Sequence, residues 1–373
     1  MSTTKKERLL SLDVFRGITI LLMILVNNPG SWSHVYSPLL HAKWNGCTPT
    51  DLVFPFFLFI VGVTTAFSLG RIKENQHDLK PVIMRLIRRS VTLFLLGLVL
   101  AGFPNFDFNS IRIPGVLQRI AIVYFFTGII FMTVNKKNII YYLVSILLIY
   151  WGLMTLIPVP GVGYANLEPS TNLGAWLDRL LLGNHLWSGS KDWDPEGLLS
   201  TIPAIGTALL GVMTGYWLKS DNDKTIKTVW MFFYGIVLMA LGYVWDFWFP
   251  INKSLWTSSY VIYTGGLALV FLVFCYWLID VQDKKWWIKP FHIYGMNAIT
   301  VFFLSGIFGR LLYLIKVADS LGESVPLKTF IYQEIFLPFF SPINASLMYA
   351  ISFILLWLFF MWLLYRKNIF IKV

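Results

Sequence analysis

The sequence predicts an all-α fold: a polytopic membrane bundle of about ten transmembrane helices with both termini on the cytoplasmic side. Of the 373 residues, 57% are hydrophobic and only 13% are charged, and the mean hydropathy is +0.66. Several apolar runs reach the roughly 20 residues that a helix needs to cross about 30 Å of hydrocarbon. Because lipid offers no partners to open backbone groups, helices are the expected way to span it.

Polar breaks divide the first half of the chain into five expected helices. A polar segment around His41 separates the first helix from the second, and a basic segment that starts at Arg71 separates the second from the third. A turn that ends at Gly115 precedes the fourth helix, and Lys136 lies between the fourth and the fifth. Apolar length and these breaks place the helices at 17–36, 51–70, 88–103, 116–134 and 138–157.

Five more helices are expected in the second half. A long segment at 158–197 precedes the sixth, Lys219 follows it, and Lys253 and Lys284 mark the next two breaks. A second long segment, 314–342, precedes the last helix. Connections of this length usually carry function. The expected helices are 198–218, 227–249, 256–279, 289–313 and 343–365, and we expect residues 1–373 to form a single transmembrane domain.

The lysines and arginines predict the orientation. About twenty of them fall in the N-terminal segment, in every second connection and in the C-terminal segment, and about seven fall in the other connections. Short loops rich in positive charge stay in the cytoplasm, so both termini are expected there, with His41 on the outer side. The net charge of +11 therefore reflects membrane topology, and no nucleic-acid partner is expected. No small-residue cleavage site follows the first apolar run, so we expect it to be retained.

Polar residues within the expected spans indicate a polar interior, because charged groups in lipid usually pair or face water. Several have simpler structural explanations. Asp13 and Arg16 can pair on one helix face, Asn27 can hydrogen-bond between helices, and Arg119 can extend its side chain to the interface. The set comprises Asp13, Arg16, Asn27, Asn28, Asp51, Gln118, Arg119, Asp246, Asn297 and Arg310.

The polar segment around His41 is the strongest candidate for chemistry. Its imidazole precedes Asn45 and Thr48 closely, and Asp51 enters the membrane ten residues after it. A neutral imidazole can act as a general base or carry an acyl group. Asp51 can orient that ring, bind an acceptor or cap its helix. No histidine or cysteine pair has metal-ligand spacing, so no metal site is expected.

Sequence motifs along nearly the whole chain resemble one known family, the heparan-α-glucosaminide N-acetyltransferases and their bacterial relatives. Two segments are specific: HAKWNGCTPTDLVFP, which runs from His41 to Pro55, and PINKSLW, which runs from Pro250 to Trp256. Weaker matches are DVFRG from Asp13, IPGVLQR from Ile113, PEG from Pro195 and GMN from Gly295.

The resemblance implies transfer of an acetyl group from cytosolic acetyl-CoA, through the membrane, to the amine of a glucosamine-type acceptor on the outer side. It implies that His41 is the catalytic histidine, acting as general base or acetyl carrier, with Asn27 beside it and Asp51 in support. Asn45 and Glu196 are expected to bind the acceptor, although Glu196 and Asp194 can also be solvated loop charges. The residues expected to line the acetyl-CoA path are Gln118, Arg119, Asn252, Lys253, Trp256 and Asn297.

Two other functions stay open at this point: a small-solute transporter, and an O-acyltransferase of an envelope glycan. The animal members of the family carry an extra lumenal N-terminal region and a preceding helix that have no counterpart in this sequence. That difference leaves the acceptor open and favours a bacterial inner membrane, with His41 facing the periplasm. A homodimer is also considered.

Overall fold

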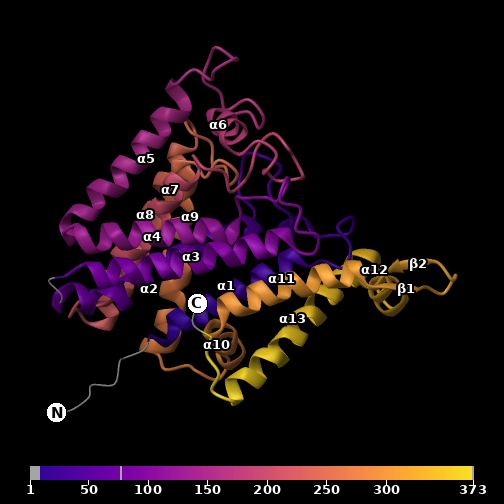
Figure 1. Ribbon diagram of the computed structural model, residues 1–373. Coiled ribbons are helices and arrows are strands. Elements are labelled where there is room, and N and C mark those ends of the chain that lie inside the picture. Colours follow the sequence, from indigo (N-terminus) through magenta and orange to yellow (C-terminus); the bar gives the residue numbers. More distant parts are fainter. Residues whose placement is uncertain (1–8, 76–77, 372–373) are drawn as a thin grey trace.

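The computed structural model describes residues 9–75 and 78–371, and it is mainly helical, as predicted (Figure 1). The long helices are α1 (Leu10–Asn27), α2 (Pro49–Asn75), α3 (Lys80–Gly102), α4 (Val116–Thr133), α5 (Ile139–Leu156), α7 (Thr201–Leu218), α8 (Lys224–Trp245), α9 (Ser258–Tyr276), α11 (Ala298–Leu314) and α13 (Pro342–Arg366). The shorter elements are η1 (Ser37–Leu39), η2 (Lys136–Asn138), α6 (Leu173–Leu182), η3 (Trp277–Val281), α10 (Lys289–Met296), β1 (Lys316–Ala318), β2 (Ser324–Pro326), α12 (Leu327–Phe330) and η4 (Ile331–Phe336).

Within the described residues, eight helices are long and apolar enough to cross a membrane, and α10 with α11 would make a ninth if the bent pair counts as one span. The predicted polytopic bundle is confirmed. The remaining expected span, α3, is 23 residues long but carries Arg85, Arg88 and Arg89 near its start. The guanidinium of Arg89 lies 4.8 Å from the ring centre of Tyr124, which shields part of that charge.

Three expected helices differ clearly from the structure. The third was expected at 88–103 but runs from Lys80 to Gly102, since the basic stretch with Arg85, Arg88 and Arg89 is part of the helix. The first was expected at 17–36 but runs from Leu10 to Asn27. Asp13 accepts a hydrogen bond from Arg16 at 3.2 Å, so the charged start is accommodated inside the helix, and Pro29 restricts the residue before it and prevents continuation. The ninth, expected at 289–313, is bent by 83° between α10 and α11, at Asn297.

Glycines allow several helices to pack backbone to backbone. A side-chain carbon at Gly17 of α1 would collide with a backbone carbonyl of α10, and one at Gly295 of α10 would collide with the backbone of α1. Gly62 of α2 and Gly211 of α7 allow the same close approach between their helices. Small residues at contacts are the usual way in which membrane helices gain van der Waals packing.

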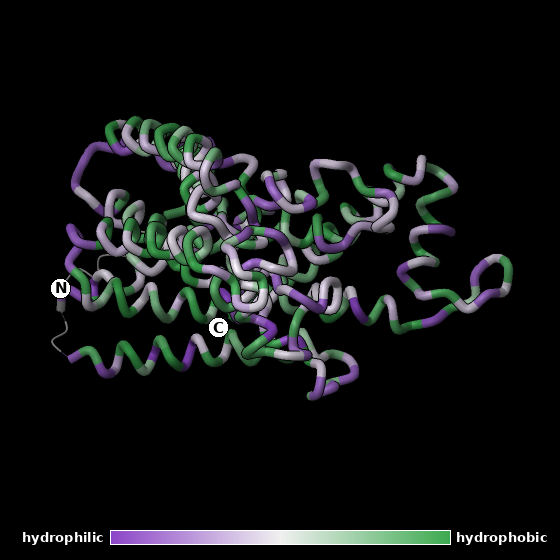
Figure 2. The backbone as a smooth tube through the Cα atoms, turned by 90° about the horizontal axis from the view of Figure 1, so that it is seen from above, coloured by the Kyte–Doolittle hydropathy of each residue, from purple (hydrophilic) through white to green (hydrophobic). Residues whose placement is uncertain are grey.

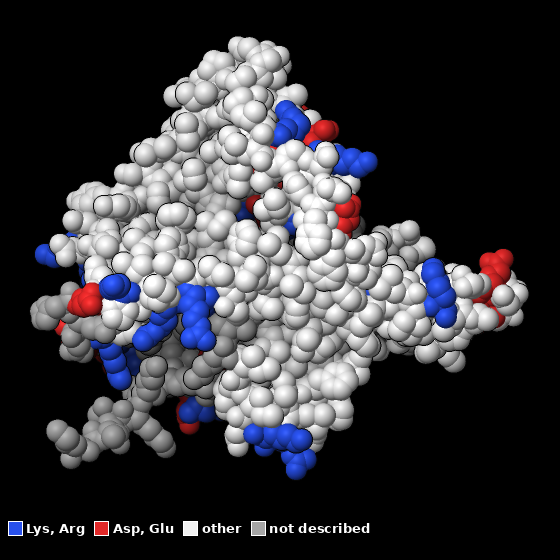
Figure 3. Space-filling view, viewed as in Figure 1, with Lys and Arg blue, Asp and Glu red and all other residues white. Residues whose placement is uncertain are grey.

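Hydrogen bonds between connections identify the two ends of the bundle. At one end, the amide of Gly46 donates to the carbonyl of Ile251 at 2.7 Å, and the amide of Ile113 donates to that of His185 at 3.0 Å. At the other end, the side-chain ammonium of Lys224 donates to the carbonyl of Asp280 at 2.9 Å. Polar residues concentrate in the turns (Figure 2), and much of the surface in one view carries no charge (Figure 3). We call the first end the His41 end.

Candidate active site

His41 lies in the loop before α2 and is held by the first turn of that helix. Its Nδ1 is 2.6 Å from Oδ1 of Asp51. The Asp51 side chain is 1% exposed, whereas that of His41 is 51% exposed. A buried carboxylate therefore anchors one side of a half-exposed imidazole. A short contact of this kind orients the ring and favours a proton on Nδ1.

The second oxygen of Asp51 organises the backbone that carries His41. Oδ2 accepts hydrogen bonds from the amides of Ala42 and Thr48, each at 3.0 Å, and from the hydroxyl of Thr48 at 3.0 Å. The Thr48 amide lies just before the first helical residue, so this contact satisfies a donor at the helix start. Two of the alternatives weighed for Asp51, orienting His41 and capping α2, thus occur together.

Lys253 completes a cluster with His41 and Asp51. Its Nζ lies 3.0 Å from Nδ1 and 3.2 Å from Nε2 of His41, and 3.7 Å from Oδ1 of Asp51. We expected this lysine along the acetyl-CoA path, and the structure places it against the imidazole. Burial lowers the pKa of Lys253, although Glu196 and Asp51 oppose the shift. An ammonium group therefore lies against both ring nitrogens of His41.

Asn45 and Asn252 connect the His41 loop to the segment between α8 and α9. Nδ2 of Asn252 donates to Oδ1 of Asn45 at 3.1 Å, and Oδ1 of Asn252 accepts the amide of Leu255 at 2.9 Å. Gly46, with φ of 105°, forms an isolated parallel bridge with Asn252. Only glycine adopts that backbone conformation readily. These contacts hold Lys253 in place beside His41.

Cys47 is the only thiol in the His41 loop and is not an activated nucleophile. Burial and the charge of Asp51 raise the pKa of Cys47 to about 12. The thiol therefore stays protonated near neutral pH, and a thiolate is the form that attacks acyl groups. Of these two side chains, the imidazole of His41 is the one poised to react.

Arg119 lies deeper in the bundle and is 1% exposed, so it does not extend to the interface. Nη2 donates to the carbonyl of Gly197 at 3.1 Å and to the hydroxyl of Ser200. Nε and Nη1 have no hydrogen-bond partner within the described residues. The guanidinium centre is 5.0 Å from the ring centre of Trp256, whose Nε1 donates to Thr207 at 3.1 Å. Two buried donors of Arg119 thus lack a hydrogen-bond partner among the described residues, which is unusual because buried polar groups are normally paired.

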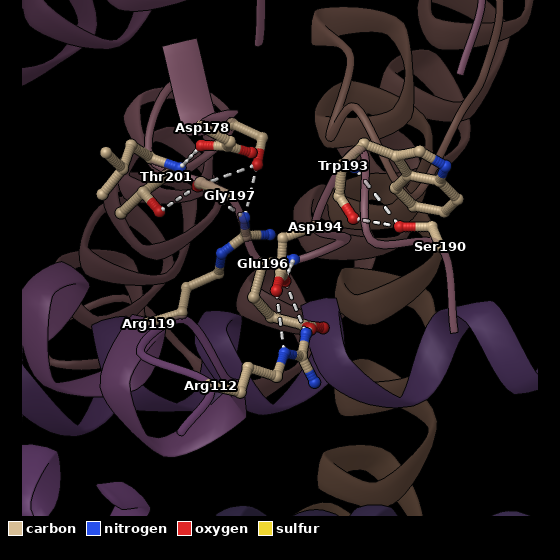
Figure 4. A network of polar contacts seen from close by, with 11 residues as sticks. Arg112, Arg119, Asp178, Ser190, Trp193, Asp194, Glu196, Gly197 and Thr201 are labelled. Carbon is tan, nitrogen blue, oxygen red and sulfur yellow. Dashed lines mark hydrogen bonds and ion pairs between the residues drawn. The ribbon is translucent and has the colours of Figure 1, made fainter. Parts of the chain in front are cut away.

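An ion-pair network surrounds Arg112 in the loop before α4 (Figure 4). Arg112 donates to both oxygens of Asp194, with Nε to Oδ2 at 2.8 Å, and to Glu196 at 2.5 Å. Asp194 and Glu196 are 3% and 9% exposed, so they are not solvated loop charges. Burial alone would raise the pKa of Glu196, but Arg112, Arg119 and Lys253 hold it below its ordinary value.

Sequence reasoning missed Arg112 and Asp178 as members of this network. Arg112 stands two residues before Pro114 of the matched IPGVLQR motif, and that position was the available signal. Asp178 of α6 has no sequence signal, because only folding brings it to the amide of Leu198, at 2.9 Å. Burial raises the pKa of Asp178 from 3.8 to about 6, and the nearby charge of Asp194 adds to the shift.

The raised pKa of Asp178 leads to a prediction of how folding stability depends on pH. Because the folded carboxyl holds its proton more tightly than the unfolded one, folding stability falls as pH rises from about 4 to about 6 and stays lower above that. We expect Asp178→Asn, which keeps an acceptor for Leu198, to raise the melting temperature at pH 7.5 and to change it little at pH 4. One pKa unit corresponds to about 1.4 kcal/mol, so the gain is at most about 3 kcal/mol. A lower melting temperature at pH 7.5 would contradict this account.

Three expected site residues form no hydrogen bond with His41 among the described residues. Asn27 is exposed at the end of α1, and no hydrogen bond among the described residues joins it to His41. Gln118 lines a cavity beside α3. Asn297 lies at the opposite end, where it donates to the carbonyl of Ile369 at 3.2 Å and accepts the amide of Ile371 at 2.9 Å. The functional roles assigned to these three residues stay predictions.

Across residues 9–75 and 78–371, no group of three or more histidine, cysteine, aspartate or glutamate side chains is arranged to hold a metal ion.

The fold and this site define a multi-pass membrane protein with a histidine–aspartate–lysine cluster at one end of its helical bundle. Residues 8–244 match the family described as "Heparan-alpha-glucosaminide N-acetyltransferase, catalytic". The chain is 33% identical to heparan-alpha-glucosaminide N-acetyltransferase of Homo sapiens, over 79% of this chain and 52% of the human protein. It is 31% identical to the Mus musculus protein of that name, over 79% of this chain and 53% of the relative.

The chain therefore belongs to the heparan-alpha-glucosaminide N-acetyltransferase family, and the resemblance noted in its motifs is confirmed. It spans about half the length of the curated relatives it matches.

Proposed function

We propose that this protein is a membrane-bound acetyltransferase that moves an acetyl group from cytosolic acetyl-CoA to the amine of an amino sugar on the outer side. The observation that supports this most directly is the His41 cluster: a half-exposed imidazole whose Nδ1 is held 2.6 Å from buried Asp51. Its membership of an N-acetyltransferase family supports the same reaction. We further propose that Asn45 and Glu196 bind the acceptor sugar.

In the proposed reaction, His41 keeps its Nδ1 proton toward Asp51. The Nε2 lone pair, which the Lys253 ammonium contacts at 3.2 Å in this structure, becomes free when that ammonium turns to the thioester oxygen. Nε2 either takes a proton from the acceptor ammonium, so that the freed amine attacks the thioester carbon, or attacks that carbon itself. In both routes the C–S bond breaks and CoA leaves as a thiolate, which takes up one of the two protons that the acceptor ammonium loses, while the other goes to solvent. In the second route the acetyl group resides first on Nε2 and then passes to the amine. The ammonium of Lys253 stabilises the negative charge that develops on the carbonyl oxygen.

The phosphate charges of CoA limit how the acetyl group can be delivered. The phosphates of CoA cannot enter lipid, so the nucleotide stays at the cation-rich end while the pantetheine arm reaches into the bundle. Two nitrogens of Arg119 have no hydrogen-bond partner among the described residues, and the ring of Trp256 lies beside the guanidinium. These two side chains are therefore candidates for holding the pantetheine arm, whose amide carbonyls can accept hydrogen bonds. Asn252 contributes by positioning Lys253, and Gln118 and Asn297 are retained as further candidates.

The cation distribution supports an outward-facing His41 end, because the opposite end carries most of the lysines and arginines of the connections. We accordingly propose that both termini are cytoplasmic and that His41 faces the periplasm of a bacterial inner membrane. The single-domain organisation and the homodimer stay predictions.

A sided assay tests this function. The purified protein is reconstituted in liposomes, and inside-out and right-side-out populations are separated. With radiolabelled acetyl-CoA on the cytoplasmic side only and glucosamine on the outer side only, we expect N-acetylglucosamine to form on the outer side. Uptake of a solute without acetylation would instead favour a transporter. Acetylation of hydroxyl groups alone would favour the O-acyltransferase.

A further inference from the structure

An apolar groove lies between α10 and the second half of α13, which pack side by side (Figure 1). Its volume is about 330 Å³, within the range of about 300 to 1,000 Å³ that is typical of small-molecule sites. We call it the α10–α13 groove. The side chains that line it and carry the argument are Lys289 and Ile293 of α10 and Leu355, Leu358, Phe359 and Trp362 of α13.

The α13 wall of this groove is one continuous apolar stripe. Leu358, Phe359 and Trp362 stand three, four and seven residues after Leu355, so the four side chains share one face of the helix over about 10 Å. Leu355 and Phe359 are 57% and 52% exposed, and the ring centre of Phe359 is 6.1 Å from that of Trp362. A hydrocarbon chain that lies along this stripe contacts α10 as well, so it gains more contacts than on a single helix face.

Two basic side chains border the groove, and neither has a carboxylate partner. Lys289 lines it, and Arg366 follows Trp362 by one helical turn, with its guanidinium 5.0 Å from the centre of the Trp362 ring. Neither cation forms an ion pair among the described residues, and Asp283, in the connection before α10, is paired with Lys285. Both cations are therefore available to an anionic group such as a phosphate.

The surroundings of the groove are typical of the boundary between lipid and water. Trp286, three residues before Lys289, is 87% exposed, and tryptophan is enriched where membranes meet water. In Figure 3, which is drawn in the same view as Figure 1, basic side chains lie at the lower edge of the molecule, where α13 ends. An anionic head group and an apolar tail are thus matched by adjacent parts of one site. The apolar walls do not suit the polar nucleotide of CoA.

We propose that the α10–α13 groove binds an anionic phospholipid, with one acyl chain along the α13 stripe and the head-group phosphate held by Lys289 and Arg366. Basic pockets between membrane helices are a known way to bind such head groups. A zwitterionic phospholipid carries its own ammonium group, which the two cations repel, so the site favours lipids with a net negative charge. Lipid binding here does not depend on the reaction at His41.

Native mass spectrometry of the purified protein tests this site, with phosphatidylglycerol and phosphatidylcholine of identical acyl chains supplied in turn. One basic residue near a membrane surface contributes about fivefold to the binding of an anionic lipid. We therefore expect the wild-type protein to bind its first phosphatidylglycerol about tenfold or more tightly than phosphatidylcholine. Lys289→Gln combined with Arg366→Gln should abolish most of this preference.

Lys80→Gln combined with Lys137→Gln is the matched control, because it removes two exposed cations at the starts of α3 and α5. This control should keep the wild-type preference. Leu355→Trp tests the apolar part of the groove: it fills the space for the acyl chain, keeps both cations and changes an exposed position. We expect it to weaken the binding of phosphatidylglycerol about fivefold or more, at an unchanged melting temperature.

Three results would overturn the lipid site. The first is equal binding of the two lipids by the wild-type protein, and the second is an equal loss of preference in the groove variant and in the control, which would show a general effect of surface charge. The third is a loss of dimer mass in Leu355→Trp with lipid binding retained, which would identify the groove as a contact between two copies of the chain. None of these measurements requires acetyl transfer, so the proposed function is tested separately.

Discussion

Replacement of His41 by alanine is expected to lower acetyl transfer by about a thousandfold or more, while the protein still inserts and folds. A positioned general base contributes about 10² to 10⁴ in rate, and the loss is larger if the imidazole also carries the acetyl group. Because the His41 side chain is half exposed, its removal leaves no cavity in the core. Radiolabelled acetyl transfer to glucosamine in reconstituted liposomes measures the effect.

His34→Ala is the matched control for this change. His34 lies in the same connection between α1 and α2, and its Nδ1 is 3.4 Å from the hydroxyl of Tyr332, away from the Asp51 cluster. We expect this variant to keep wild-type activity. Comparable activity in His41→Ala and the wild type would reject the catalytic assignment of His41.

The second large effect is expected from Asp51→Asn. An asparagine has one acceptor oxygen, so it cannot both accept from Nδ1 of His41 and keep the contacts that Oδ2 makes to Ala42 and Thr48. If its amide faces the ring, His41 takes the tautomer with the proton on Nε2, and the reactive lone pair is lost. We expect kcat to fall by about 10² to 10⁴ and the melting temperature to fall by a few degrees.

The pH dependence separates this effect from simple loss of folding. Asp51→Asn removes a charged group from the cluster around the imidazole, so the pH profile of the residual kcat should differ from that of the wild type. Asp192→Asn, which changes an exposed carboxylate at the same end, should alter neither kcat nor the profile. A full-rate Asp51→Asn enzyme with the wild-type profile would show that Asp51 serves only to cap α2.

The difference between prediction and structure is clearest at Lys253. The PINKSLW motif predicted that Lys253 belongs to the site. It did not predict that the Lys253 ammonium lies against both ring nitrogens of His41, because that contact joins loops 212 residues apart. Arg119 was correctly expected in the interior, yet its two unpaired nitrogens emerge only from the packing around it. Glu196 looked solvated, since a loop sequence does not reveal the Arg112 that covers it.

The sequence likewise predicted some helix boundaries well and missed others. Apolar length located α4, α5 and α7 closely, because lipid sets the length of a span whatever its neighbours are. It placed α1 too late, because the pairing of Asp13 with Arg16 makes a charged stretch helical. It also missed the 83° bend at Asn297, where the amide side chain binds the C-terminal segment at Ile369 and Ile371.

The amino-acid sequence by itself determined the membrane-spanning helical class and the family, and it predicted a role for His41, because hydropathy and contiguous motifs are properties of neighbouring residues. Only the tertiary structure decided which groups meet: Asp51 and Lys253 at the imidazole, Arg112 between Asp194 and Glu196, and Gln118 at the cavity beside α3. The physical reason is that pairing, desolvation and cavity shape depend on distances between segments remote in the chain, and packing sets those distances.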